Sequence, residues 1–173
     1  MKRFILFSVI TTLSLTACST YPTIQQLPFD AGEETINSPA ADMEPQIGSR
    51  YIVFSSDRRR RQDIYLYDIV ERRLLDLPEL NSFDAIASHP SISQDGRYIV
   101  FATVRQGRSG IALYDRQTRL LRNLTANLQA EVRNPTINGD GTIIAFETSV
   151  NGQWDILVYD RYGKPLGVPT DPR

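Results

Sequence analysis

The sequence is poor in the residues that most often build disulfides, metal sites and catalytic triads. Its 173 residues include one cysteine and one histidine. A single cysteine cannot form a disulfide within the chain, so the fold must be stable through packing alone. The only histidine, His89, directly precedes Pro90, and a loop position with a local hydrogen bond explains it better than a triad or a multi-histidine metal site. We therefore expect no catalytic residue, no metal and no cofactor.

The chain also lacks an excess of positive charge. Lysine and arginine number 19 against 20 aspartate and glutamate residues, a formal net charge of -1. Nucleic-acid binding usually requires a basic surface, so we expect no nucleic-acid partner. No glycine-rich phosphate loop occurs, and Asn138-Gly139-Asp140-Gly141 lacks the ligand series of a calcium loop. These absences favour a binding module over an enzyme.

Only one long apolar stretch is present, at residues 4–15, and it is too short to span a membrane. Lys2 and Arg3 precede it, and Leu15-Thr16-Ala17-Cys18 ends it, which is the layout of a secretory signal. These four residues resemble the bacterial lipobox, which implies cleavage before Cys18 and a lipid on its sulfur. The alternative is a buried thiol within an ordinary signal peptide.

Removal of residues 1–17 as a lipoprotein signal peptide would leave 17 basic and 20 acidic side chains, a net charge of -3. In the lipobox pattern a residue other than aspartate after the cysteine favours the outer membrane, and Ser19 fits. We expect an exported lipoprotein, held by Cys18 in the outer membrane and facing the periplasm. Residues 18–44 contain three prolines and several small or acidic residues, and we expect a tether with an edge strand at 27–36.

The rest of the chain repeats one unit three times. In each copy a phenylalanine precedes an aspartate by 14 positions, and the phenylalanine recurs after 47 and then 45 residues: Phe54 and Asp68, Phe101 and Asp115, Phe146 and Asp160. Each unit contains four short apolar runs separated by turn residues, which predicts four strands. A repeat of this length is typical of propeller blades. We predict an all-β fold of three four-stranded antiparallel blades at about residues 45–80, 90–125 and 135–170, within a domain of residues 45–173.

The predicted strands are apolar on both faces. Ile52 and Phe54 alternate with Tyr51 and Val53, and the later copies repeat this pattern. Both faces should therefore be covered, as in a sheet that lies between two neighbouring blades. Burial of one such side chain contributes about 1.5–3 kcal/mol, so three copies can supply a core.

Asp95-Gly96 and Asp140-Gly141 open the second and third units. Glycine supplies the positive φ of a tight turn, and aspartate can accept a hydrogen bond from its own backbone. Two aspartates can also suggest paired catalytic carboxylates. Their turn context explains them, and equivalent positions on separate blades need not approach each other.

Basic residues gather on two loops at equivalent places in the first and second units. They are Arg58, Arg59, Arg60, Arg61, Arg105 and Arg108. Because such loops emerge on one face of a meander, they predict a basic patch that meets phosphate, lipid head groups or an acidic partner. The alternative is a solvated hairpin tip that charge keeps soluble.

The pattern of Pro90, Asp95-Gly96, Phe101 and Asp115 resembles the WD40-like repeat of the TolB β-propeller family. The resemblance covers about residues 45–170 and implies a TolB-like propeller with a general binding role. TolB itself is a soluble periplasmic protein with an α/β domain before six blades. The three repeats here correspond to half of such a propeller.

Propellers close with about four to eight blades, so three blades leave sheet faces uncovered. We hypothesise that two chains form a six-bladed ring; an open stack, or completion by another protein, are alternatives. The leading function is a lipid-anchored scaffold that binds proteins of the cell envelope. The second is an accessory propeller for an envelope hydrolase or carbohydrate-active enzyme, and the third is a self-assembling half-propeller.

Overall fold

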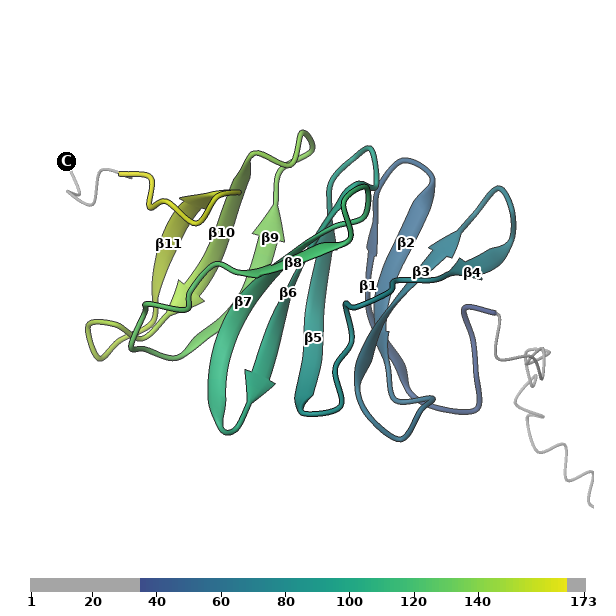
Figure 1. Cartoon of the computed structure of the whole chain (residues 1–173), viewed down its shortest axis with the longest axis horizontal. Helices are drawn as coiled ribbons and strands as arrows, with labels where there is room; N and C mark the ends of the chain where they lie inside the picture. The colour runs from purple at the N-terminus through teal and green to yellow at the C-terminus, as the bar shows by residue number, and fades with distance from the viewer. Residues whose placement is uncertain (1–34, 168–173) are drawn as a thin grey trace, which may run out of the picture.

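The computed structural model describes residues 35–167, which form three antiparallel sheets standing side by side in chain order (Figure 1). Within each sheet the strands pair in sequence order. The first sheet contains β1 (Asp42–Ile47), β2 (Tyr51–Ser56), β3 (Asp63–Asp68) and β4 (Arg73–Leu75). The second contains β5 (Ala85–Ile92), β6 (Tyr98–Arg105), β7 (Arg108–Asp115) and β8 (Leu120–Asn123), and the third contains β9 (Val132–Ile137), β10 (Ile143–Thr148) and β11 (Asp155–Asp160). The predicted all-β class and the antiparallel blades are confirmed.

The third sheet differs from the prediction because it has three strands within residues 35–167. After β11 the chain turns at Gly163, where φ is 87°, and forms only an isolated bridge between Tyr159 and Pro165. Within residues 35–167 no helix is long and apolar enough to span a bilayer.

The innermost strand of each blade begins before the proline at which the repeat pattern placed the blade start. β1, β5 and β9 begin at Asp42, Ala85 and Val132, and each continues past its proline. Proline cannot donate a ladder hydrogen bond, so it normally marks the start or edge of a strand. Here each of these strands contains a register shift that accommodates it.

Two apolar clusters hold the three blades together. Val53, Ile64 and Leu66 of the first blade pack with Ile99, Phe101 and Tyr114 of the second. The other cluster joins Val100, Ile111 and Leu113 of the second blade to Ile144, Phe146 and Tyr159 of the third. The successive residues Ile99 and Val100 thus belong to opposite clusters and are both 0% exposed. The prediction that both faces of the central blade are covered is confirmed.

The two end faces of the stack differ in how far their apolar side chains are exposed. On the third blade Ile143 and Ile156 are 43% and 61% exposed. On the first blade Phe54 and Tyr65 face away from the second blade, since both alternate with members of the shared cluster, yet they are only 2% and 8% exposed. A group within residues 35–167 must therefore shield Phe54 and Tyr65 from water on this end face.

Candidate functional site

Three equivalent residues, Glu44, His89 and Asn134, adopt an unusual backbone conformation. Each directly precedes the proline of an innermost strand, and their φ angles are 56°, 49° and 50°. Proline disfavours the α region for the residue that precedes it. A positive φ at a non-glycine residue costs of order 1–3 kcal/mol. Each lies at the register shift of its strand, so the extra residue bulges out of the ladder.

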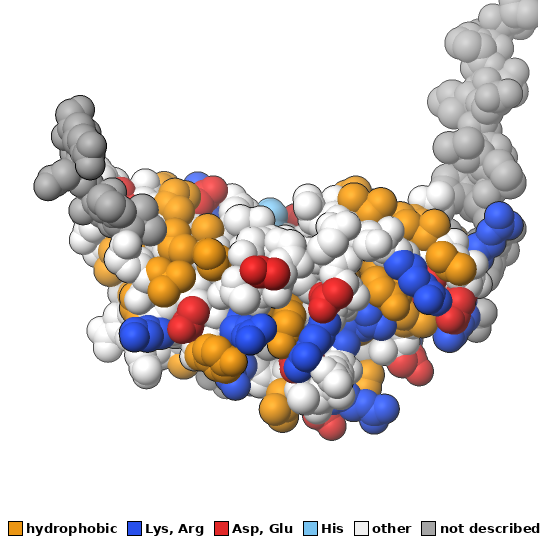
Figure 2. Space-filling view, turned by 90° about the horizontal axis from the view of Figure 1, so that it is seen from above, with side chains coloured by type: hydrophobic (Ala, Val, Ile, Leu, Met, Phe, Trp, Pro, Cys, Tyr) orange, Lys and Arg blue, Asp and Glu red, His pale blue; other side chains and the backbone are white. Residues whose placement is uncertain are grey.

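The three bulges converge on one cavity of about 200 Å³, where β1, β5 and β9 line the inner edge of the stack. Gln46, Pro90, Ser91, Pro135 and Thr136 complete its lining. Figure 2 shows this edge as a hollow, with the histidine side chain in pale blue within it. A bulge with a proline protects a strand edge from pairing, which explains the backbone at these positions. It does not explain the choice of glutamate and histidine.

Glu44 and His89 bind each other across the first two blades. The His89 backbone N–H donates to Glu44 Oε2 at 2.6 Å, and His89 Nε2 lies 3.1 Å from Glu44 Oε1. The Ser55 hydroxyl also donates to Glu44 Oε2, at 2.9 Å. The carboxylate is therefore fixed in place beside an imidazole that is about half exposed.

A second carboxylate, that of Glu147 on the third blade, binds the cavity-lining residue Asn134. Glu147 accepts hydrogen bonds from Asn134 Nδ2 at 3.0 Å and from Arg133 Nε at 2.6 Å. These bonds, the one from Asn134 first, lower the pKa of Glu147 below its usual value. The guanidinium of Arg133 also lies 3.7 Å from the ring centroid of Trp154. The inner edge thus presents ordered carboxylates, an amide and an imidazole, which are groups suited to hydrogen-bonding a polar segment.

Among residues 35–167 there is no group of three or more histidine, cysteine, aspartate or glutamate side chains arranged to hold a metal ion. The side chains of the inner edge donate and accept hydrogen bonds. We therefore treat it as a binding surface.

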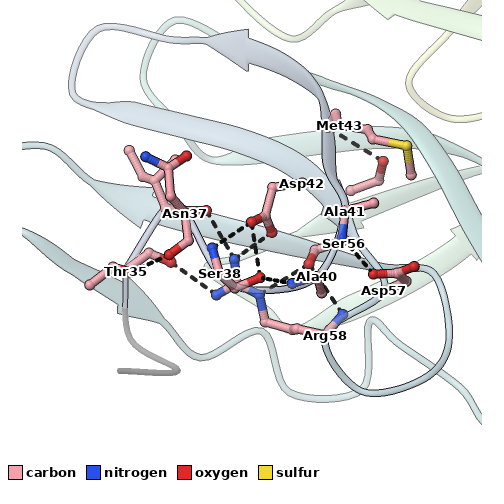
Figure 3. Close-up of polar contacts among 12 residues, drawn as sticks. Thr35, Asn37, Ser38, Ala40, Ala41, Asp42, Met43, Ser56, Asp57 and Arg58 are labelled. Carbon is pink, nitrogen blue, oxygen red and sulfur yellow. Dashed lines mark hydrogen bonds and ion pairs between the residues drawn. The ribbon is translucent and has the colours of Figure 1, made fainter. Parts of the chain in front are cut away.

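The predicted basic loops do not form one uniform patch. Arg58, whose side chain is only 6% exposed, points back onto the first blade. It donates to the carbonyl oxygens of Thr35 and Ile36 at 2.9 and 3.0 Å, and to Asp42 Oδ1 at 2.6 Å (Figure 3). The predicted edge strand at 27–36 lies outside the described residues, apart from Thr35 and Ile36, which are not part of a strand.

Arg58 covers part of the first end face. Its guanidinium lies 5.3 Å from the ring centroid of Phe54 and 4.7 Å from that of Tyr65. Those two rings are themselves stacked, with centroids 5.8 Å apart. A planar cation over two aromatic faces shields them from water.

The other loop arginines divide into paired and exposed groups. Arg61 forms an ion pair with the buried Asp63 at 2.7 Å, and Arg105 lies 3.3 Å from Asp84. Arg59, Arg60 and Arg108 are exposed. A binding role for the exposed arginines stays a prediction.

The predicted turn residues connect neighbouring blades. Gly96 and Gly141 have φ angles of 73° and 72°, and a Cβ on either would lie 2.1 or 2.4 Å from the ring of Tyr51 or Tyr98 in the preceding blade. Asp95 accepts hydrogen bonds from Ser93 Oγ and Arg97 N, and Asp140 accepts them from Thr142. The aspartates therefore bind their own turns, and the glycines allow the blades to approach.

Glu44, Asn134 and His89 were missed as a group in the sequence. The available signal was their regular spacing, since each directly precedes a proline and 45 residues separate them. Cys18 lies outside the described residues.

The arrangement of blades can be compared with solved structures. TolB from Acinetobacter baumannii superposes with a TM-score of 0.59 and 22% identity, over 72% of this chain and 31% of that chain. A putative TolB from Agrobacterium tumefaciens gives 0.59 and 19%, over 75% and 48%. The chain has a TolB-like β-propeller fold. The β-propeller domain of the Trilobed protease from Pyrococcus furiosus has a TM-score of 0.54 at 15% identity, over 74% of this chain and 42% of that chain.

The TolB-like chain therefore spans less than half the length of each of these three proteins. No family model matches its sequence, and a search of the curated proteins gives no match. At these identities the comparisons establish the fold alone.

Proposed function

We propose that this chain is a protein-binding module of the cell envelope, and that its partner binds along the inner edge formed by β1, β5 and β9. The observation that carries the proposal is the convergence of Glu44, His89 and Asn134 on one cavity. Strained backbone is often kept where a function requires it, and glutamate is an uncommon choice at positive φ.

A polar protein segment is the partner that this edge suits. Carboxylates, an amide and an imidazole are held by the contacts of Glu44 and Glu147 described above. Fixed donors and acceptors lose little conformational freedom on binding, which favours recognition. Lipid on Cys18 would hold the chain at the outer membrane on the periplasmic side, so the partner is a protein of the envelope.

Retention of envelope proteins by the immobilised chain tests the proposal. The double variant His89→Gly and Asn134→Gly removes two side chains, and glycine accepts the positive φ at both positions. We expect the variant to keep or raise the melting temperature, because strain is relieved, and to lose the retained partner.

The matched comparison is the variant Arg59→Ser and Arg60→Ser, which removes exposed loop charge and leaves Arg58 in place. We expect it to retain the partner. Loss of the partner with the loop variant, together with full retention by the glycine variant, would transfer the site to the basic loops.

Self-assembly is a second candidate function, and the exposed residues of the two end faces support it. Ile143 occupies the place of Tyr51 and Tyr98, which in the other blades receive the turn of the next blade. Ile143 is 43% exposed on the third blade, and Ile47 is 69% exposed on the first. A second copy could cover both residues in a six-bladed ring, and a partner enzyme with its own blades could do the same.

A further inference from the structure

The joint between the second and third blades contains a cavity of about 250 Å³, separate from the inner edge. Three arginines, two tyrosines and one aspartate provide most of its polar lining: Arg97, Arg122, Arg161, Tyr98, Tyr162 and Asp115. In a chain whose net charge is -1, this lining carries two more positive than negative charges.

Only one of the three guanidinium groups is neutralised by a carboxylate in this cavity. Arg97 binds Asp115 through two hydrogen bonds of 3.0 and 2.8 Å. Arg161 instead lies 5.4 and 5.3 Å from the ring centroids of Tyr98 and Tyr162, and Arg122 lies 5.8 Å from that of Tyr162. No carboxylate of residues 35–167 lies within ion-pair distance of Arg122 or Arg161.

The equivalent joint between the first and second blades shows that the repeat does not require this charge. There Arg50 binds both Asp68 and Glu71, and Glu71 also binds Arg73. The position of Glu71 becomes Thr118 in the second blade, and that of Leu75 becomes Arg122. Arg73 in turn becomes Leu120, so one carboxylate is lost and a guanidinium moves from the position of Arg73 to that of Arg122.

The cavity also offers apolar walls beside the cations. Tyr98 and Leu113 form a buried side, at 8% and 5% exposure, while Leu120 and Tyr162 are more than half exposed. Guanidinium groups bind carboxylate and phosphate oxygens with two donors, and tyrosine rings stack on flat ligands. We propose that this cavity binds an organic oxyanion, a carboxylate or phosphate group carried on an aromatic or apolar body.

Calorimetric titration of the full chain with phenyl phosphate and with benzoate tests the proposal. We expect millimolar or tighter binding of at least one of them, and the tighter one assigns the ligand as a phosphate or a carboxylate. Benzyl alcohol and inorganic phosphate should bind at least tenfold more weakly than that ligand. Equal binding of benzyl alcohol would overturn the need for an oxyanion, and equal binding of inorganic phosphate would overturn the apolar body.

The first joint supplies substitutions that the fold already accommodates. The variant Thr118→Glu with Arg122→Leu introduces two residues of the first joint, restoring a carboxylate and removing a guanidinium, and should weaken binding at least tenfold. Arg73→Leu, at the first joint, should leave binding unchanged. Binding that survives the double variant, or no binding to the unaltered chain, would overturn the proposal. His89→Gly with Asn134→Gly should not alter this titration, so the outcome is independent of the proposed protein-binding edge.

Discussion

Gly96 shows how a single residue can connect two blades. The ring of Tyr51 lies so close to Gly96 that a Cβ would be only 2.1 Å from the Cδ2 atom of that ring. Arg116 also packs over the same ring at 4.5 Å and donates to the Gly96 carbonyl oxygen at 2.6 Å. Glycine is thus needed here for its backbone conformation and for its missing side chain.

Substitution of Gly96 by alanine should destabilise the chain much more than substitution of Gly107. Both glycines have positive φ, 73° and 76°, but nothing lies within 4 Å of a Cβ on Gly107. We expect a cost of about 1–2 kcal/mol for Gly107→Ala and about 2 kcal/mol more for Gly96→Ala. Urea unfolding gives both free energies, and equal losses would contradict the role of the ring contact.

Asp115 makes stability depend on pH at the same joint. The hydrogen bonds from Arg97 lower the pKa of Asp115 to about 2. A carboxylate with a lowered pKa in the folded state stabilises the fold above its unfolded pKa, and this stabilisation is lost as the pH falls toward 2.

Asp115→Asn should therefore reduce the free energy of unfolding by about 1–2 kcal/mol at pH 7. The difference between the two chains should shrink between about pH 4 and pH 2, because Asp115 is protonated first in the unfolded chain and near pH 2 in the folded chain as well. Urea titrations at several pH values measure it. A difference that stays constant down to pH 2 would show that the charge on Asp115 contributes nothing.

At the scale of the elements, Arg58 covers apolar side chains on the outer face of the first blade, as a neighbouring blade covers those of the second. Its guanidinium covers Phe54 and Tyr65 and binds Asp42, whose side chain is only 12% exposed. Arg58→Met should cost about 2–4 kcal/mol, because it leaves a largely buried carboxylate without this partner. Arg60→Gln, on the same loop, should change stability by less than about 0.5 kcal/mol. Similar losses for the two variants, in thermal or urea unfolding, would contradict this assignment.

The strands themselves were largely predictable from alternation. The apolar runs at Ile52, Ile99 and Ile144 all lie in middle strands, and the following Leu-Tyr-Asp or Val-Tyr-Asp segments lie in the next strands. The segments before the prolines were not predicted, because a proline within a central strand violates the usual pattern. A bulge with positive φ resolves that conflict, and a residue type such as glutamate or histidine gives no local sign of it.

The candidate site was less predictable than the fold. A run of four arginines indicates a surface, but the inward position of Arg58 depends on Phe54, Tyr65 and the approach of Thr35, which only the folded chain brings together. The prediction of His89 as a loop residue with a local hydrogen bond is wrong, because the residue lies in β5 and its partner Glu44 is 45 residues away. Contacts between blades are long-range, and no short pattern encodes them.

At the scale of the whole molecule, the three blades form an open stack whose ends differ. Ile47, Ile143 and Ile156 remain exposed at the two end faces. If two copies close a ring through these faces, sedimentation of the delipidated chain should show a dimer, and Ile156→Lys should convert it to a monomer while Ile86→Lys, on the second blade, should not. A monomer at micromolar concentration for the unaltered chain would contradict ring formation.

The inner edge is the feature on which the proposed function depends, and crosslinking in intact cells examines it directly. A photoreactive benzoylphenylalanine is placed at Thr136, which lines the cavity, or at Arg60, on the exposed basic loop. We predict a discrete crosslinked envelope protein from position 136 and none from position 60. A crosslinked protein from position 60 alone would contradict the assignment of the inner edge as the binding surface.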